Sequence, residues 1–405
     1  MTLSTDMLPD FPMPREAGCP FAPPREMMRL HAEDPVSKVR LWDGSTPWLV
    51  TRYEDQRALF GDQRLSVDTT RDGFPYHTEA FRDTTSTTPP SFLNMDDPDH
   101  ARIRRMVTGP FTVKRIESLR PAIQRMTDDL IDAMLAGPNP VDLVEALALP
   151  LPSLVICEML GVPYEDHDFF QSKSKVSLRR DVTSEEARAA AGALFAYLGE
   201  QLDKKLAEPA DDLLTDFAVR MRDGDLSRLE ATMLGQLLLG AGHETTANMI
   251  ALGTLAFLEH PDQLAIVRDT DDPKVLASAA EEMLRYLTIV HTGQRRLALE
   301  DLEIGGQLVR AGEGVIIAAA TGNWQDDVFP DPDRLDVHRD ARRHMAFGFG
   351  IHQCLGQQLA RLELQVVYGT LLRRVPTLRL ATGLDKIPFK DDGIVYGVYE
   401  LPVTW

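Results

Sequence analysis

The sequence predicts a mainly α-helical protein with a small β-rich region. The strongest sign is the segment 227–260, which is apolar on most faces of a helix and stops at Pro261. Other segments repeat apolar residues at steps of three and four, as amphipathic helices do. Strand-like runs are short and confined to three regions. Because no repeat, low-complexity linker or shift in composition divides the chain, we expect residues 1–405 to form one domain.

The remaining elements follow in chain order. Residues 1–25 are rich in proline, which predicts an extended arm on the surface. The other predicted elements are strands at 39–42 and 48–51, helices at 126–135, 149–160 and 184–206, β-like stretches at 296–308 and 394–403, and a last helix after Cys354 with an apolar stripe of Leu355, Leu359, Leu362 and Val366.

The helix predicted over 227–260 should run through the interior. At 1.5 Å per residue it would be about 50 Å long. A membrane span is the alternative for so apolar a helix, but His243, Glu244 and Asn248 lie in its middle and oppose that interpretation. A buried helix with polar residues at its centre indicates a site there.

Composition and charge exclude several classes of protein. Hydrophobic residues make up 43% and charged residues 26%, which excludes disordered and collagen-like chains. The formal net charge of -19 argues against nucleic acid as the main partner. Three cysteines cannot form a disulfide framework, which favours a reducing compartment. With no signal peptide or spanning segment recognised, we expect a cytoplasmic protein, a monomer without membrane contact.

Cys354 lies where a glycine-rich loop enters a helix. A helix N-terminus carries partial positive charge and free N–H groups, and both favour a thiolate. The glycines at 348, 350 and 356 let the backbone approach a flat partner, and Phe347 can shield the sulfur from water. A single thiolate beside a flat partner indicates haem. The alternative is a buried structural cysteine, which is our interpretation of Cys19 and Cys157.

The pattern Phe347-x-x-Gly350-x-x-x-Cys354-x-Gly356 resembles the haem-binding signature of the cytochrome P450 superfamily. The resemblance extends over residues 35–405 and is greatest to soluble actinobacterial members that act on secondary metabolites and drug-like molecules. It implies a cytochrome P450 fold, with haem b between the long central helix and the helix that follows Cys354. It also implies that Cys354 is the proximal ligand of the haem iron.

Two further motifs resemble those of the family. Ala241, Glu244 and Thr245 on the long helix resemble its oxygen-binding turn. There Ala241 and Gly242 leave room for a diatomic ligand, Thr245 bonds back to the carbonyl of Ala241, and Glu244 relays protons from solvent. The alternative is a capping-like polar patch. A structural motif is also implied: an ion pair of Glu282 and Arg285, joined by Arg334, that locks the cysteine loop. The alternative for the pair is a surface ion pair.

The haem propionates need cationic or donor partners. By resemblance these are His100, Arg104, Arg296 and His352, although each alone is typical of a surface charge or a satisfied histidine. The family often has Asn-Arg-Asp where this chain has Asn323, Trp324 and Gln325. The resemblance therefore does not predict the contacts of that loop.

Electrons should come from separate proteins, because the chain has no Gly-x-Gly-x-x-Gly fingerprint and no flavin or iron–sulfur module. We expect a ferredoxin and its NAD(P)H-dependent reductase. The segment 100–120 is basic, and by resemblance an acidic ferredoxin docks there. The alternative is a solvated helix face.

The resemblance places the substrate against apolar side chains and suits a bulky hydrophobic molecule. The expected contacts are Phe92, Leu93, Leu238, Ile289, Val290 and Thr292. The leading hypothesis is a monooxygenase that hydroxylates a C–H bond. A peroxide-driven peroxygenase and a non-catalytic haem sensor are the alternatives.

Overall fold

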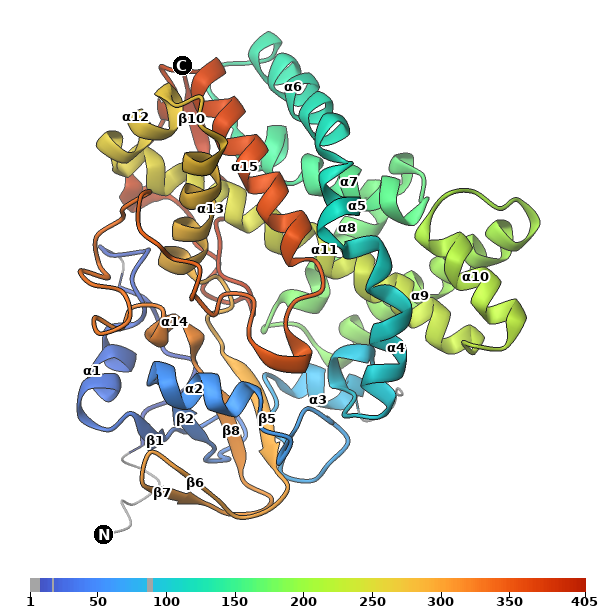
Figure 1. The fold of residues 1–405 in the computed structure, drawn as a ribbon, viewed down its shortest axis with the longest axis vertical. Helices are drawn as coiled ribbons and strands as arrows, with labels where there is room; N and C mark the ends of the chain where they lie inside the picture. The colour runs from blue at the N-terminus through green and yellow to red at the C-terminus, as the bar shows by residue number, and fades with distance from the viewer. Residues whose placement is uncertain (1–7, 17, 86–89) are drawn as a thin grey trace.

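The computed structural model describes residues 8–16, 18–85 and 90–405. Helices form the larger part of the molecule, and a smaller β-rich part lies beside the first two helices (Figure 1). The predicted fold class is therefore confirmed. None of the helices formed by the described residues has the length and apolar character that a membrane crossing requires.

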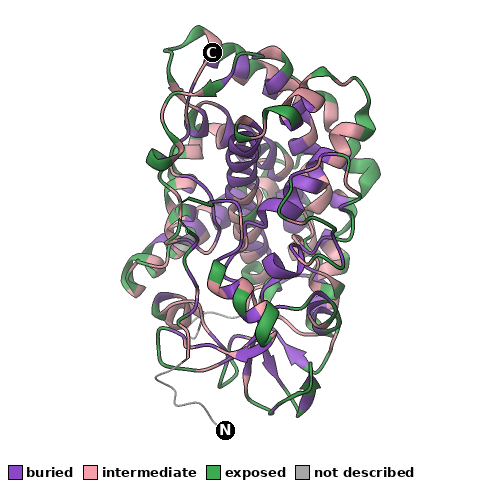
Figure 2. Ribbon diagram, turned by 90° about the vertical axis from the view of Figure 1, so that its left-hand side faces the viewer, coloured by how far each residue is buried: buried purple, intermediate pink, exposed green. Residues whose placement is uncertain are grey.

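The longest helix is α11, Arg228–Glu259, with 32 residues. Ser227 caps its N-terminus through a capping box with Glu230, and Pro261 begins the next helix directly after it. Its second half is buried almost without a break, which the buried colour at the centre of Figure 2 shows. The prediction of a long interior helix is confirmed.

The helices α7 to α10, α12, α13 and α15 pack on α11, whereas α1, α2 and α14 lie with the β-rich part. Those predicted at 126–135, 149–160 and 184–206 are found as α6, α7 and α9. The helices are α1 (Arg25–Glu33), α2 (Tyr53–Phe60), α3 (Glu79–Thr85), α4 (Asp99–Val107), α5 (Val113–Glu117), α6 (Arg120–Ala136), α7 (Pro150–Leu160), α8 (His167–Leu178), α9 (Ser184–Ala207), α10 (Leu213–Asp223), α12 (Pro261–Asp269), α13 (Pro273–Leu287), α14 (Ala319–Gly322) and α15 (Gln357–Arg374).

The strands form three small sheets. The five-stranded sheet has the order β1-β2-β8-β5-β3, in which only the pair β2 and β8 is parallel. The order in the three-stranded sheet is β4-β10-β9, and β6 pairs with β7. The strands are β1 (Val36–Lys38), β2 (Trp48–Val50), β3 (Leu65–Ser66), β4 (Val141–Asp142), β5 (Gln294–Ala298), β6 (Leu302–Ile304), β7 (Gln307–Val309), β8 (Gly314–Ile317), β9 (Arg379–Leu380) and β10 (Pro402–Thr404).

Two strand predictions need correction. The strand predicted at 39–42 lies earlier, in β1, because residues 39–47 form the turn that returns the chain to β2; there Leu41 N–H donates to the Ser45 carbonyl at 2.9 Å. Of the stretch 394–403, only the last residues join a strand, β10.

The N-terminal arm is also more than a surface segment. Phe11 and Met13 are buried in a core cluster together with Leu49 and Ile316. Arg15 is buried, donates to the carbonyl of Phe21 at 2.8 Å, and lies over the Tyr396 ring. The arm is therefore held by its apolar side chains and by this cation.

Candidate active site

A cavity of about 390 Å³ lies beside the middle of α11 and is bordered by the loop before α15, by α4 and by the segment 289–294. It brings together most of the residues expected at the site. They are Phe92, Leu93, His100, Arg104, Leu238, Ala241, Thr245, Ile289, Val290, Phe347, His352 and Cys354.

Four expected residues do not line this cavity. Thr292 is fully buried behind the wall, where its hydroxyl donates to the Ile394 carbonyl at 3.4 Å. Arg296 is buried next to the cavity and electrostatically affects His352. Glu244 points to a separate small polar cavity. Gly350 has a structural position in the cysteine loop.

The cysteine loop owes its shape to glycines with positive φ. Gly350 has φ 76°, and a Cβ on it would lie 2.5 Å from the carbonyl oxygen of Phe60. Gly350 therefore lets the loop pack on α2, instead of making room for a flat partner as expected. Within the loop, Cys354 N–H donates to the Phe347 carbonyl at 2.9 Å, which fixes the two residues at the cavity wall.

The Cys354 side chain is exposed to the cavity, and protein atoms surround its thiol closely enough to desolvate it. Burial raises the pKa of this thiol, although the Gly356 N–H, Arg104 and Arg361 act in the opposite direction. The Gly356 N–H before α15 favours the thiolate, as expected, but burial outweighs it when no metal is bound. A metal cation next to the sulfur would supply further stabilisation of the thiolate. Of the other cysteines, Cys157 is buried as expected, whereas Cys19 is exposed.

Arg361 on α15 was not predicted from the sequence. Its guanidinium lies 4.6 Å from the centre of the Phe347 ring and 2.5 Å from a carboxylate oxygen of Glu281. His344 contacts the other oxygen of Glu281 at 3.1 Å. Burial raises the pKa of Glu281, but the hydrogen bonds from His344 and Arg361 outweigh it and lower that pKa to about 2. The feature of the sequence that could have indicated this role is the position of Arg361 early in the helix that follows Cys354.

Cationic and donor groups gather at one edge of the cavity, where Asp97 contacts the Nδ1 atom of His100 at 3.3 Å. The rings of His100 and His352 have centres 4.1 Å apart, and His100 Nε2 is buried without a hydrogen-bond partner among the described residues. Among the residues that the structure describes, neither Arg104 nor Arg296 has an ion-pair partner. Burial and the neighbouring His100, Arg296 and Arg104 lower the pKa of His352 to about 3.

This donor set fits the haem that the resemblance implies. Buried cations are costly unless an anion pairs with them. The two propionates of haem provide such anions, on a ring that would extend from this edge towards Cys354. The sulfur, His100, Arg104 and His352 line one cavity, as residues that hold a haem would.

The polar turn of α11 has the expected hydrogen bond, from Thr245 Oγ1 to the Ala241 carbonyl at 2.9 Å. Both residues line the cavity, whereas Glu244 lies 3.6 Å from Lys390 Nζ in the polar cavity. Gly242 has a packing role, because a Cβ there would lie 2.8 Å from Ile156. The turn therefore presents Thr245 to one cavity and Glu244 to another.

The Glu282–Arg285 ion pair is completely buried, with 2.7 Å between Arg285 Nε and a Glu282 oxygen. The third member is Arg339, whose Nε lies 3.1 Å from Glu282, and not Arg334 as predicted. Arg334 is exposed, and its carbonyl accepts a hydrogen bond from Arg339. The segment 331–339 folds around Arg339, so the Arg334 side chain turns outward.

Each residue of the unusual Asn323-Trp324-Gln325 loop forms hydrogen bonds with neighbouring segments in the structure. Asn323 Oδ1 accepts from the N–H of Met345 at 2.8 Å. Trp324 stacks on Tyr286 and donates to its carbonyl, and Gln325 accepts from the N–H of Tyr53. The departure from the family pattern therefore leaves the support of the cysteine loop intact.

Comparisons with known proteins agree with this site. The family model described as Cytochrome P450 matches residues 184–380. The chain is 59% identical over 399 residues to cytochrome P450 GfsF of Streptomyces halstedii, covering 98% of this chain and 96% of that protein. It is 40% identical over 395 residues to 20-oxo-5-O-mycaminosyltylactone 23-monooxygenase of Streptomyces fradiae, covering 96% and 90%.

Solved structures share the fold as well. The crystal structure of GfsF matches with a TM-score of 0.92 over 98% of this chain and 100% of that chain. The mycinamicin VIII C21 methyl hydroxylase MycCI from Micromonospora griseorubida, bound to mycinamicin VIII, matches with the same TM-score at 40% identity, over 98% and 100%. From the identity over nearly its whole length, together with the site geometry, we conclude that the chain belongs to the cytochrome P450 family and is a haem-iron monooxygenase.

Proposed function

We propose that this enzyme hydroxylates a bulky, mostly hydrophobic secondary metabolite at a haem b whose iron is bound by the Cys354 thiolate. The observation that carries the proposal is the group of donors at the edge of the cavity that Cys354 borders: His352, the unpartnered Nε2 of His100, and Arg104 and Arg296, which form no ion pair with a described residue. A thiolate-ligated haem activates dioxygen and favours cleavage of its O–O bond. Phe347 and Ala241 both line this cavity and would help to hold the haem.

Thr245 and Glu244 are proposed to deliver protons from solvent to the reaction site. The Thr245 hydroxyl is on the cavity side of α11, where its hydrogen bond to Ala241 fixes its orientation. Glu244 is next to Lys390 in a polar cavity also lined by Lys175, Arg179 and Asn248. We assign to Glu244 the exchange of protons with solvent and to Thr245 their presentation to the reacting oxygen.

The cavity walls support a hydrophobic substrate. Phe92, Leu93, Leu238, Ile289 and Val290 contribute apolar surface, as expected for a pocket that binds such a molecule. Two relatives are named for oxidising 20-oxo-5-O-mycaminosyltylactone and mycinamicin VIII. These names support a large natural product as the substrate of this chain.

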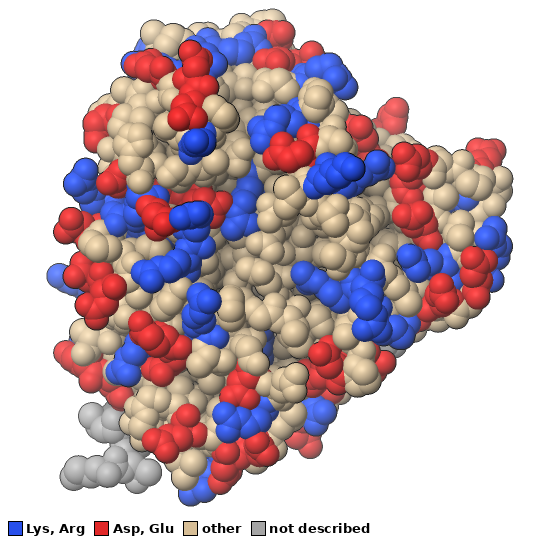
Figure 3. Space-filling view, viewed as in Figure 1, with Lys and Arg blue, Asp and Glu red and all other residues tan. Residues whose placement is uncertain are grey.

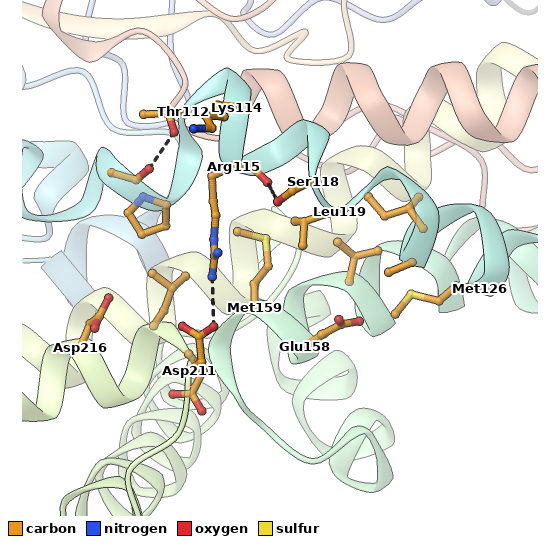
Figure 4. Close-up of a pocket in the computed structure, with 17 residues that line it drawn as sticks. Thr112, Lys114, Arg115, Ser118, Leu119, Met126, Glu158, Met159, Asp211 and Asp216 are labelled. Carbon is orange, nitrogen blue, oxygen red and sulfur yellow. Dashed lines mark hydrogen bonds and ion pairs between the residues drawn. The ribbon is translucent and has the colours of Figure 1, made fainter.

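Electrons are proposed to come from NAD(P)H through a reductase and a ferredoxin that docks on the basic segment 100–120. Lys and Arg side chains gather over α4 on the face seen in Figure 3. Part of that charge is already neutralised, since Arg102 pairs with Glu230 and Arg115 lies 3.4 Å from Asp211 across a surface groove (Figure 4). Arg105 and Lys114 are exposed and in no ion pair with a described residue, so they are best suited to an acidic partner.

The chain is further proposed to act as a single haem-binding domain, as a monomer and in the cytoplasm. The described residues contain free cysteines and no disulfide, which agrees with a reducing compartment.

Turnover of a macrolactone panel tests the proposed reaction. The purified holoenzyme is supplied with NADPH, ferredoxin and reductase in one assay and with hydrogen peroxide in another. We expect hydroxylated product in the first. Product with peroxide alone would establish the peroxygenase, and a haem protein inert in both assays would establish the sensor.

A further inference from the structure

We infer that Arg15 of the N-terminal arm is a positioning residue for the wall of the haem cavity that Ile289 and Val290 form. Arg15 is not among the residues that line this cavity, so it would act through the main chain behind the wall. The inference rests on the proposed function, because a wall held in one position matters only where a ligand binds beside the haem. It gives the arm a part in ligand selection.

Arg15 is buried, yet it forms no ion pair with a described residue. Only 9% of the residue is exposed, and its guanidinium donates to the carbonyls of Pro20, Phe21 and Ala22 at 3.3, 2.8 and 3.0 Å. Burial lowers the pKa of Arg15 to about 10, so the side chain stays charged at neutral pH. Because a buried charge is costly, an apolar side chain would serve better if packing were its only role.

Two further contacts of Arg15 reach the wall. Its Nη2 atom donates to the carbonyl of Leu287, the last residue of α13, at 3.3 Å. Its guanidinium carbon also lies 4.1 Å from the centre of the Tyr396 ring. Tyr396 in turn donates its N–H to the Ile289 carbonyl at 2.8 Å. Arg15 therefore supports the chain just before the wall directly, and supports Ile289 through Tyr396.

The backbone between these two points of support is strained. Thr288 has φ 35°, in the left-handed region that a β-branched residue rarely adopts. Such a conformation is unfavourable and persists only where neighbouring groups hold it. Asn323 Nδ2 donates to Thr288 Oγ1 at 2.9 Å, and Arg15 binds the carbonyl that precedes Thr288. Without Arg15 the turn should relax, and Ile289 and Val290 should move with it.

Two azole probes test the inference through the haem spectrum of the holoenzyme. Imidazole is too small to reach the wall, whereas clotrimazole carries a bulky triaryl group. Arg15→Met should bind imidazole as the wild type does and clotrimazole about fivefold more weakly, because the wall loses about one net hydrogen bond that favours its binding conformation. Arg25→Met is the matched control and should change neither affinity, since the Arg25 side chain at the end of the arm is 86% exposed.

A double-mutant cycle with Ile289→Ala shows whether Arg15 acts through the wall. Ile289→Ala alone should weaken clotrimazole binding, because it removes apolar surface from the cavity. The double variant with Arg15→Met should lose clearly less affinity than the product of the two separate losses, since the side chain that Arg15 positions is already truncated. Losses that multiply in full would place the action of Arg15 elsewhere and contradict the inference.

Hydrogen exchange provides a readout that does not depend on the haem. In Arg15→Met, peptides that cover 287–292 and 394–398 should exchange faster, whereas the buried half of α11 should exchange as in the wild type. An unchanged ratio of the two azole affinities in the folded variant would overturn the inference, even if its Tm falls, and would leave Arg15 a structural role.

Arg15→Lys keeps the positive charge but lacks the planar fork of donors, so it decides by the same measurements if Arg15→Met does not fold. It should also weaken clotrimazole more than imidazole, and a wild-type ratio would overturn the inference. Failure of imidazole to shift the wild-type haem spectrum would contradict the proposed haem site instead. The exchange rates of 287–292 and 394–398 would then decide the role of Arg15 on their own.

Discussion

At Cys354 the protein places a thiol on the wall of the cavity, where a metal could bind it. Burial raises the pKa of the thiol, and the opposing effects of the Gly356 N–H, Arg104 and Arg361 do not cancel that rise. The iron is therefore expected to complete the ionisation. Nearby, His100 Nε2 has no hydrogen-bond partner and Arg104 has no ion-pair partner among the described residues, so the propionates of haem would supply acceptors that the protein itself does not provide.

Thr245→Ala should separate electron consumption from product formation, because the variant loses the hydroxyl on the cavity side of α11 while its backbone stays helical. We expect the ratio of product to NADPH consumed to fall by about tenfold or more, in the range of general acid–base effects. Thr245→Ser keeps the hydroxyl and should retain most of the coupling. An unchanged ratio in Thr245→Ala would refute the role of Thr245 in proton delivery.

At the scale of elements, the cysteine loop is supported by contacts that come from distant segments. Arg339 reaches the Glu282–Arg285 pair of α13, and Arg361 of α15 joins Glu281 to the Phe347 ring. These contacts connect the loop to the two helices that flank it.

Arg339→Ala should lower the free energy of unfolding by about 2 to 4 kcal/mol, because it removes a partner from the buried Glu282 carboxylate. The matched variant Arg334→Ala should change it by no more than about 0.5 kcal/mol, since that side chain is exposed. Urea denaturation measures both. Equal effects of the two variants would contradict the assignment of Arg339.

The pH dependence of stability should reflect Glu281. Its folded pKa of about 2 lies below the ordinary value of 4.5, so the carboxylate stabilises the fold above pH 4.5 and loses that contribution as pH falls towards 2. The contribution is about 3 kcal/mol at neutral pH. The gap in Tm between the wild type and Glu281→Gln should therefore be largest near pH 7 and shrink below pH 4.5. A gap independent of pH would contradict this account.

The sequence predicts best what is local. The helix α11 follows from a continuous apolar pattern with Ser227 before it and Pro261 after it, and the Cys354 signature lies within ten residues. The choice between Arg334 and Arg339 depends on the path of a loop whose carbonyls converge on one guanidinium, and no local pattern encodes that path. Likewise, the burial of the N-terminal arm depends on contacts of Phe11 and Met13 with strands far along the chain.

Over the whole molecule, a net charge of -19 coexists with a basic area over α4. Several arginines of this area form ion pairs with acidic neighbours. Only the cations without such a partner are then available to attract an acidic ferredoxin. Arg102 is one of the arginines that already has an acidic partner, Glu230. Replacing it with a glutamate would therefore also place two carboxylates next to each other.

Arg105→Glu combined with Lys114→Glu should therefore slow ferredoxin-supported turnover at least about tenfold at low salt, and the difference should shrink as salt screens the charges. Lys386→Glu, an exposed site on another element, is the matched control. Stopped-flow reduction by ferredoxin measures the effect. Unchanged rates in the double variant would place the docking surface elsewhere.

The central claim is that Cys354 binds the haem iron as a thiolate, and the CO-difference spectrum of the reduced holoenzyme tests it most directly. The wild type should show the long-wavelength Soret band of thiolate-ligated haem. Cys354→Ser should retain the fold and lose that band. A wild-type protein that binds haem and CO without the thiolate band, or a Cys354→Ser variant that keeps it, would contradict the claim.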